Sequence, residues 1–561
     1  MSAHGKPRGF IIKYYIIHTN RVKGSKSFGR GAIALAFIGI VAKLIGALYR
    51  VPLTNIVGAE GMGLYQMVFP LYTVLLSICG GGITSAVSRV VAKYTAVGND
   101  VAARRTVRVA LLPLLSVSLI SAGSVALLRN VISGVQGNTD AAVCYIALCP
   151  SLLFAGGINV LRGYFQGKSQ MLPSGVSQLI EQIIKLVLGL YLSRRLLAYG
   201  VKYAVAGALI GVTTGEFIAL AYLCIRYFIV MRKRVRYIAL ERLPAETASE
   251  FSVSPNDVSD KILLKELYSF ALSVTLGALV LPITQMIDSA LVINLLIYGG
   301  ATRGNATALF GLFVGPVGTL INMPTVVALS VAIAFLPTLT SAVERGADTS
   351  ESTRAAAKWI MLFVIPVTLA FLLFPDRVCR ALYSKGLTEE QLETAAQLLR
   401  VQSISVFYIG VLQLSTTVLQ GYNKAHKPVI NLVIGACVKV GLTPVLVRIF
   451  GIVGAAGATA ACYAVAAVLS ARCAYKCAPI GLNASDAVVK PLSVSLIGAA
   501  AFFGMTVALK STAMPYLWQT VIAAAVFVAV YAAGVILTGA FDVNALKALR
   551  HKKNIDDIAN N

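Results

Sequence analysis

Charged residues are scarce in this sequence. Asp, Glu, Lys and Arg make up 13% of its 561 residues, whereas 57% are hydrophobic; a soluble domain has roughly 25% charged residues. This composition excludes a water-soluble enzyme. Apolar runs long enough to cross a bilayer, about 20 residues each, instead recur from residue 30 to residue 540. Because they lack the alternation of barrel strands, we expect an all-α polytopic membrane protein.

Histidine and paired cysteine are also sparse. The chain has four histidines, all in predicted tails or loops: His4, His18, His426 and His551. A histidine proton relay inside the membrane is therefore excluded. Among the nine scattered cysteines, Cys473 and Cys477 lie close in sequence, but no second pair of ligands accompanies them. We expect no metal and no cofactor.

The sequence shows no ATP-binding loop, no catalytic motif and no pattern of a cleavable signal peptide. No loop of the G-x-x-x-x-G-K-S/T type is present, which excludes ATP as the direct energy source. No nucleophile and general base converge, so we do not expect an enzyme. The stretch "GFIIKYYIIHTN" is short, interrupted by Lys13 and followed by basic residues, unlike a cleavable signal peptide.

Acidic residues are outnumbered, with 23 Asp and Glu against 49 Lys and Arg, a formal charge of +26. In a soluble protein this charge would suggest nucleic acid; here, cationic loops that face an anionic cytoplasmic leaflet explain it. Most basic residues lie on the inner side if both termini are cytoplasmic, as the positive-inside rule requires. One loop, with Arg194, Arg195 and Lys202, would be external. We expect membrane lipids as partners and no nucleic acid.

The apolar runs predict fourteen transmembrane helices. Their approximate ranges are 30–53, 65–92, 106–128, 141–163, 173–193, 203–228, 264–297, 307–340, 356–374, 393–420, 427–447, 452–474, 489–510 and 517–539. We therefore divide the chain into six parts. A basic cytoplasmic tail (1–28) precedes an N-lobe of six helices (29–229), and a cytoplasmic linker (230–261) leads to a C-lobe of six helices (262–478). Two further helices (479–540) and a second cytoplasmic tail (541–561) follow.

The two lobes share a sequence pattern. "LRGYFQGKSQMLPSG" follows the fourth predicted helix and "LQGYNKAHKP" follows the tenth. Each has Leu-x-Gly-Tyr, a lysine-bearing turn and a proline that opens the next helix, which then carries Lys185 or Lys439. The pattern indicates a duplicated six-helix lobe. Parallel repeats of this kind are related by a pseudo-twofold axis along the membrane normal and enclose a cavity that opens alternately.

Several intramembrane charges are candidates for the walls of that cavity. Lys43 and Arg50 are seven residues apart and share one helical face. A charge on a lipid-facing surface costs about 2.5–3.5 kcal/mol, so we expect both to border water. Lys439 is expected on the opposite wall. Glu181 and Lys185 are four residues apart and form either part of the cavity or a structural ion pair.

Other residues have possible roles in coupling or motion. Glu216 and Asp288 are isolated acids in apolar helices and are candidates for a protonation or cation site. Gly80, Gly81 and Gly82 offer close packing or a hinge.

Some polar residues have simpler explanations. Arg89 and Arg162 lie near cytoplasmic helix ends, where snorkelling explains them. We assign five amide side chains to bridges between helices rather than to a substrate: Gln66, Asn159, Gln178, Gln182 and Gln285.

The basic candidates predict an anionic substrate, because cations form charge-assisted hydrogen bonds with a diphosphate. A MATE-like antiporter of cationic drugs is the alternative, although acids and aromatics would be expected in its cavity. A membrane-embedded scaffold without transport is a third reading. Transport would run on an ion gradient or the membrane potential.

Residues 45–94 and 162–182 resemble the polysaccharide-export branch of the MOP flippase superfamily, most closely its stage V sporulation protein B-like members and more distantly MurJ-like lipid II flippases. The resemblance implies a MATE-like fold of fourteen helices, alternating access in the bacterial cytoplasmic membrane, and a polyprenyl-diphosphate-linked sugar such as lipid II as substrate. It also implies cell-wall or polysaccharide synthesis proteins as partners.

The resemblance also assigns a role to Arg50. In MurJ-like proteins an arginine precedes the turn that closes the first helix, and Arg50 precedes Gly58-Ala59-Glu60. Arg50 would be a diphosphate ligand at a broken helix end near Pro52. The pattern departs in the second helix, where the family has an arginine pair and a glutamate but this chain reads "TVLLSICGGGITSA".

Overall fold

The computed structural model describes residues 34–240, 259–478 and 485–539, apart from residues 36, 98 and 513. All regular elements within these ranges are helices, which confirms the all-α prediction. The predicted tails 1–28 and 541–561 and most of the predicted linker lie outside the described residues.

Helices follow one another with short connections. After helical residues 37–48, the first part contains α2 (Arg50–Leu76), η1 (Ser77–Gly81), α3 (Ile83–Ala96), α4 (Asp100–Val135), α5 (Ala141–Gly167), α6 (Met171–Leu196), η2 (Leu197–Tyr199) and α7 (Val201–Leu240). The second part contains α8 (Asp260–Tyr298), α9 (Arg303–Leu312), η3 (Phe313–Val317), α10 (Gly318–Glu344), α11 (Ser350–Leu373), α12 (Pro375–Tyr383), α13 (Glu389–Gly421), α14 (His426–Phe450), α15 (Ile452–Cys477), η4 (Ser485–Val489), α16 (Lys490–Leu509) and α17 (Tyr516–Leu537).

Twelve helices within the described residues are long and apolar enough to cross a membrane. One continuous run, Phe37–Ala96, covers the first and second predicted helices. The seventh predicted helix lies on α8, where the apolar stretch Pro282–Tyr298 is shorter. The chain is therefore a multi-pass membrane protein, while the number fourteen stays a prediction.

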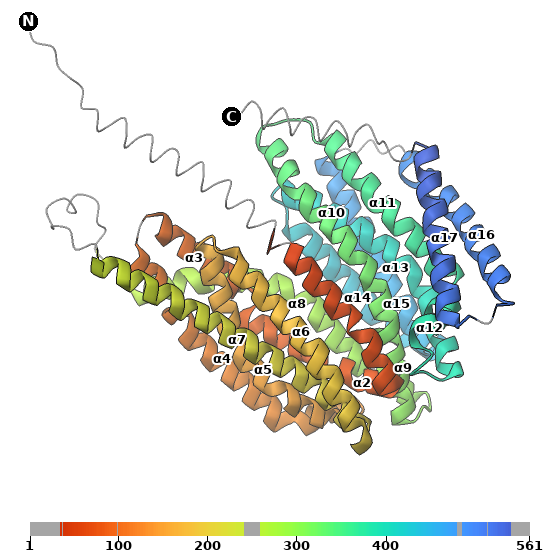
Figure 1. The fold of residues 1–561 in the computed structure, drawn as a ribbon, viewed down its shortest axis with the longest axis horizontal. Helices are drawn as coiled ribbons and strands as arrows, with labels where there is room; N and C mark the ends of the chain where they lie inside the picture. The colour runs from red at the N-terminus through yellow and green to blue at the C-terminus, as the bar shows by residue number, and fades with distance from the viewer. Residues whose placement is uncertain are drawn as a thin grey trace, which may run out of the picture.

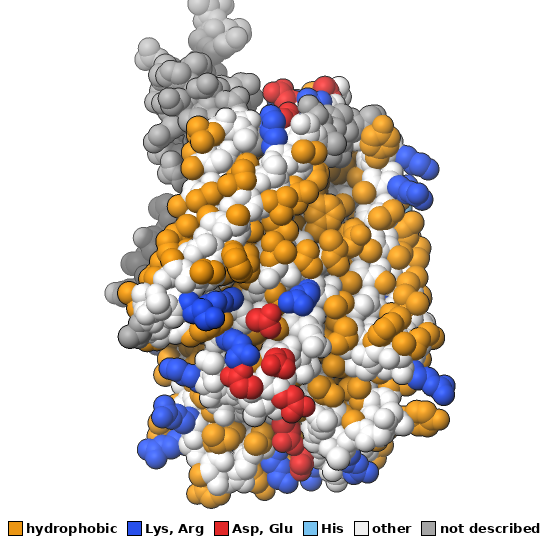
Figure 2. Space-filling view, turned by 90° about the vertical axis from the view of Figure 1, so that its right-hand side faces the viewer, with side chains coloured by type: hydrophobic (Ala, Val, Ile, Leu, Met, Phe, Trp, Pro, Cys, Tyr) orange, Lys and Arg blue, Asp and Glu red, His pale blue; other side chains and the backbone are white. Residues whose placement is uncertain are grey.

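The surface of the molecule is apolar over wide areas. Figure 2 shows a face with a wide area of hydrophobic side chains across its upper half and right side; Lys, Arg, Asp and Glu gather in its lower half, and a few more lie at its top and right-hand edges. On α16 and α17, Ile497 and Val528 each expose 62% of their surface. Exposed apolar faces of this size are costly in water but suit the hydrocarbon core of a bilayer.

The helices form two groups (Figure 1). Helices α3–α7 lie together on one side and α10–α17 on the other, with α2 and α8 between them. The first half of α8 packs on the first group, since Leu263 and Leu267 are buried in a core with residues of α3, α4 and α5. The second half of α8 reaches α14, where Asp288 pairs with Lys439. Because α8 contacts both groups, the lobe boundary at residue 262 remains a prediction.

Glycines bring α2 and α9 into close contact at one end of the molecule. A Cβ on Gly63 would lie 2.1 Å from the carbonyl oxygen of Thr307, and one on Gly311 would lie 2.1 Å from that of Ala59. Only glycine permits α2 and α9 to approach this closely. The Asn55 side chain also donates to the Leu382 carbonyl at 2.8 Å. We call this contact region the sealed end.

We expect Gly311→Ala to destabilise the protein by about 1–3 kcal/mol, because the added methyl group must push α2 away from α9. Gly123→Ala on α4 is the matched control, since its Cβ meets no atom within 4 Å and helix propensity favours alanine by about 0.5–1 kcal/mol. Thermal unfolding of the purified protein in detergent measures both. Equal unfolding temperatures for the two variants would contradict the assigned packing.

Candidate functional site

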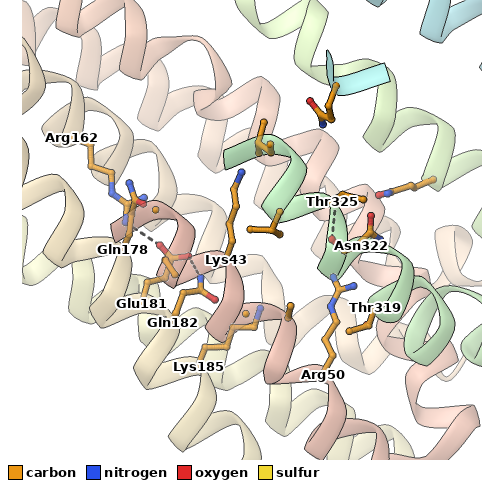
Figure 3. A pocket seen from close by; sticks show the side chains of 18 residues that line it. Lys43, Arg50, Arg162, Gln178, Glu181, Gln182, Lys185, Thr319, Asn322 and Thr325 are labelled. Atoms are coloured by element: carbon orange, nitrogen blue, oxygen red, sulfur yellow. Dashed lines mark hydrogen bonds and ion pairs between the residues drawn. The ribbon is translucent and has the colours of Figure 1, made fainter. Parts of the chain in front are cut away.

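A cavity of about 620 Å³ lies between the two groups of helices. Its first wall comes from residues 39–50 together with α5 and α6, and it carries five charged side chains: Lys43, Arg50, Arg162, Glu181 and Lys185. Its second wall comes from α8, α10 and α13, and its polar side chains are uncharged: Gln285, Thr319, Asn322, Thr325 and Gln413. In Figure 3, Lys43 and Arg50 project between α6 on one side and α10 on the other.

The charge of the cavity is strongly asymmetric. Four basic residues and one acid give the first wall a formal charge of +3 (four minus one), and the lining residues of the second wall add none. A concave site of one sign, bounded by apolar helices, concentrates ions of the opposite sign. The cavity therefore favours anions.

Aromatic rings hold two of the cations. The Arg50 guanidinium lies 5.9 Å from the centre of the Phe69 ring, and the Lys185 ammonium lies 5.5 Å from the same ring and 5.1 Å from that of Tyr49. Each cation–π contact contributes about 0.5–2 kcal/mol. Within the described residues, neither cation forms an ion pair with a carboxylate. Their N–H groups are therefore available to a ligand.

Arg50 is positioned by the first turn of α2. The helix is interrupted at Tyr49, between helical residues 37–48 and α2, close to the helix end that we predict near Pro52, although the Leu53 amide still donates to the Tyr49 carbonyl at 3.2 Å. Proline is tolerated there because a first-turn N–H needs no helical acceptor. The backbone leaves helical geometry a second time at Gly58, with φ 69° and ψ −170°, a conformation that favours glycine. Lys43 lies about two turns from Arg50, further from the sealed end.

Glu181 pairs with Arg162 and not with Lys185. An Arg162 Nη2 lies 3.0 Å from Glu181 Oε2, and Arg162 Nε donates to Ser177 Oγ at 2.8 Å. The Gln182 amide donates to the other Glu181 oxygen at 3.1 Å. Of the two alternatives for Glu181 and Lys185, the structure favours the cavity, which both residues line. They do not form the alternative ion pair, because Lys185 turns towards aromatic rings while the guanidinium of Arg162 on α5 reaches the carboxylate.

Arg162 is a cavity residue that the sequence interpretation missed. Snorkelling at a helix end accounted for it without any function, yet it lines the cavity. The repeat held a signal: Arg162 stands in Leu-x-Gly-Tyr where the second copy has Gln420. A charge present in one copy and absent from the other indicates a specialised wall.

Lys439 lies away from the cavity, contrary to the sequence expectation. Its ammonium forms an ion pair with Asp288, and both side chains are buried. Two opposite charges buried together avoid the cost of leaving either one unpaired. Asp288 is thus not the isolated acid that we expected, because the ammonium occupies the place of an added cation.

Glu216 lines a second pocket of about 240 Å³ beside the cavity. The Tyr72 hydroxyl donates to Glu216 Oε1, and Glu216 Oε2 has no hydrogen-bond partner in the described part of the chain. Glu181 and Arg162 line this pocket as well as the cavity. The two sites thus share an ion pair as a common wall.

Of the three consecutive glycines, two serve close packing. A Cβ on Gly82 would lie 2.1 Å from the Ala271 carbonyl oxygen, and one on Gly80 would lie 2.0 Å from the Asn159 amide nitrogen. A Cβ on Gly81 would lie 3.5 Å from its nearest neighbour, the Cβ of Ser77, and Gly81 lines the second pocket. A hinge at this place remains a prediction.

The amide side chains divide between two roles. Gln66 bridges helices, since it donates to the Val314 carbonyl at 3.3 Å. Gln178, Gln182 and Gln285 line the cavity, and Asn159 lines the second pocket, where it accepts from the Thr84 hydroxyl. The amides therefore contribute polar surface to both sites.

Comparison with known proteins identifies similar chains. Residues 28–343 match the family described as polysaccharide biosynthesis protein. The chain is 26% identical to stage V sporulation protein B of Bacillus subtilis (strain 168), over 82% of this chain and 86% of that protein. It is 25% identical to lipid II flippase MurJ of the same organism, over 77% and 80%.

Solved structures establish the fold class. The fold is similar to that of lipid II flippase MurJ in an inward closed conformation, with a TM-score of 0.62 and 14% identity over 90% of this chain and 98% of that one. It is also similar to an inward-facing multidrug resistance MATE family transporter of the MOP superfamily, with a TM-score of 0.60 and 15% identity over 78% and 94%. The predicted MATE-like fold is confirmed.

We expect Lys439→Met to lose about 3–5 kcal/mol of stability, because Asp288 is then a buried charge without a partner. The double variant Lys439→Met with Asp288→Leu should recover most of this loss, since neither charge remains. Unfolding temperatures of the three proteins in detergent test both statements. A stable single variant would show that the ion pair does not hold α14 against α8.

Proposed function

We propose that this chain, which belongs to the polysaccharide biosynthesis protein family, is a flippase for a polyprenyl-diphosphate-linked sugar, such as a precursor of peptidoglycan or polysaccharide. It moves the head group from the inner to the outer leaflet of the bacterial cytoplasmic membrane. The observation that carries the proposal is the cavity between two groups of helices, with a wall of formal charge +3 opposite an uncharged polar wall.

The two walls suit the two parts of such a head group. Arg50, Lys185 and Lys43 offer N–H donors that lack carboxylate partners among the described residues and so bind diphosphate oxygens through charge-assisted hydrogen bonds. Hydroxyl and amide side chains opposite, from Thr319, Asn322 and Gln413 among others, bind sugar hydroxyls. The wall of cations thereby replaces the water that an anion loses inside the membrane.

The direction of transport follows from the predicted topology. With the N-terminus cytoplasmic, the sealed end lies on the outer side and the cavity receives its substrate from the inner leaflet. An anion that moves outward is driven by an inside-negative potential, by about 2.3 kcal/mol per charge per 100 mV. The membrane potential, alone or with an ion gradient, therefore drives the cycle.

The hydrocarbon tail stays in the lipid while the head group crosses. Helices α16 and α17 pack on the second group through Phe502, whose ring centre is 4.3 Å from that of Phe374, and through the Tyr531 hydroxyl, which donates to the Leu362 carbonyl at 2.6 Å. Their outer faces are apolar and exposed. They supply a surface along which a polyprenyl chain can lie.

A MATE-like antiporter of cationic drugs is disfavoured by the charge of the cavity. Such a transporter can share this fold, but a wall of formal charge +3 repels organic cations. We expect proteoliposomes that contain the chain to take up no lipophilic organic cation, whichever ion gradient is imposed. Saturable uptake of such a cation would favour the antiporter.

We expect Arg50→Ala to slow leaflet exchange of a polyprenyl-diphosphate sugar about 10- to 100-fold, because one charge-assisted hydrogen bond contributes about 1.5–3 kcal/mol. The measurement follows a labelled lipid-linked sugar in proteoliposomes with an imposed membrane potential.

The matched control for that experiment is Arg194→Ala. This arginine is exposed near the end of α6 and does not line the cavity, so its loss removes the same charge without changing the site. Exchange should then proceed at the rate of the unmodified protein. If the two variants were equally active, Arg50 would not bind the diphosphate.

A further inference from the structure

Glu216 is a buried carboxylate without a cation of its own. It lies on α7 and exposes only 5% of its surface. The Tyr72 hydroxyl donates to one oxygen, and the other, Oε2, has no partner among the described residues. An unpaired charge buried in this way is costly. Among the described residues, the acids Glu181 and Asp288, which also lie within predicted membrane helices, each have a basic partner.

The second pocket gives Glu216 room for a ligand. Its volume is about 240 Å³, several times the roughly 30 Å³ that one water molecule occupies. Oxygen-bearing side chains surround it, namely Ser77, Thr84 and Asn159 beside the carboxylates Glu181 and Glu216. Oxygen ligands of this kind suit a proton carried with water or an alkali-metal ion.

Arg162 separates the second pocket from the cavity and lines both. It contacts Glu181 and Ser177 of α6, and its guanidinium is the basic group that the two sites share. A diphosphate in the cavity attracts the same guanidinium. The carboxylate and the head group therefore compete for Arg162.

We propose that the second pocket takes up one positive charge, as a proton or as an alkali-metal ion, and that Arg162 links this uptake to the binding of the head group. The inference rests on the proposed function. When Arg162 turns to the diphosphate, Glu181 loses its partner and faces Glu216 across the pocket. A cation then relieves the repulsion between the two carboxylates. In the reverse direction, a cation in the pocket releases Arg162 to the cavity.

The two binding events strengthen each other by the same factor, because linkage between sites is reciprocal. The cation also compensates part of the head-group charge. The head group and the cation together carry one negative charge fewer, which lowers the cost of desolvation and also reduces by one the charge that the membrane potential drives outward.

Other ionisable groups around Glu216 do not replace the cation. The groups that face it are Tyr72 on α2, Arg162 on α5, and Glu181 and Lys185 on α6. Lys185 lines the cavity and not the second pocket, and Arg162 is paired with Glu181. Tyr72 supplies a hydrogen bond without a charge.

The test measures the affinity of the purified full-length protein for pyrophosphate in detergent micelles. One series varies the pH in sodium-free buffer, and a second varies sodium at constant pH and ionic strength. We expect the affinity to rise roughly tenfold, within the usual range of coupling between sites, as protons or sodium are added. The series that responds identifies the cation.

Glu216→Gln is the decisive variant, because it keeps the shape of the side chain and removes its charge. Pyrophosphate should still bind, but neither protons nor sodium should change its affinity beyond the effect of pH on pyrophosphate itself. Glu181→Gln, which leaves one carboxylate in the pocket, should weaken the dependence. Glu390→Gln, at an exposed position in the first turn of α13, removes an equal charge elsewhere and should keep the full dependence.

The outcomes separate this inference from the proposed function. If pyrophosphate binds the unmodified protein and Glu216→Gln with the same dependence on pH and sodium, the linkage is refuted and the diphosphate site stands. If pyrophosphate fails to bind the unmodified protein under every condition, the diphosphate site is refuted and the linkage falls with it.

Discussion

Cations without carboxylate partners, held inside a membrane-embedded bundle, are the constraint on which this structure depends. Arg50 and Lys185 lie against the faces of Phe69 and Tyr49, and a charge in contact with lipid would cost about 2.5–3.5 kcal/mol. They are tolerated because a cavity lies beside them. The cavity is bounded on the side of the sealed end, where Gly63 and Gly311 permit backbone contact between α2 and α9.

The two copies of the repeat have diverged in charge while keeping the same pattern. Lys185 and Lys439 occupy corresponding places, yet Lys185 faces the cavity and Lys439 is neutralised by Asp288. Arg162 corresponds to Gln420. The first copy thus provides the anion-binding wall, while α10 and α13 of the second part provide an uncharged polar wall. A substrate with an anionic part and a neutral polar part matches this division.

The intramembrane acids follow one rule with an informative exception. Glu181 has Arg162 and Asp288 has Lys439, so each of these charges is balanced within the protein. Glu216 has a hydroxyl donor and a free oxygen that faces a pocket. Since Arg162 borders both sites, the linkage that we propose needs only a change of its partner and no large movement of the backbone.

Composition and local periodicity determined the membrane class, the helices and the common face of Lys43 and Arg50, because hydrophobic length and the helical repeat act over about 20 residues. The family resemblance predicted the MATE-like fold and the role of Arg50 as a diphosphate ligand. Only the tertiary structure decided which charges pair, since Lys439 and Asp288 are 151 residues apart and Arg162 reaches Glu181 from a neighbouring helix. It also showed a second departure from helical geometry at Gly58, beyond the interruption near Pro52. Pairing depends on how distant helices face one another, which no local pattern encodes.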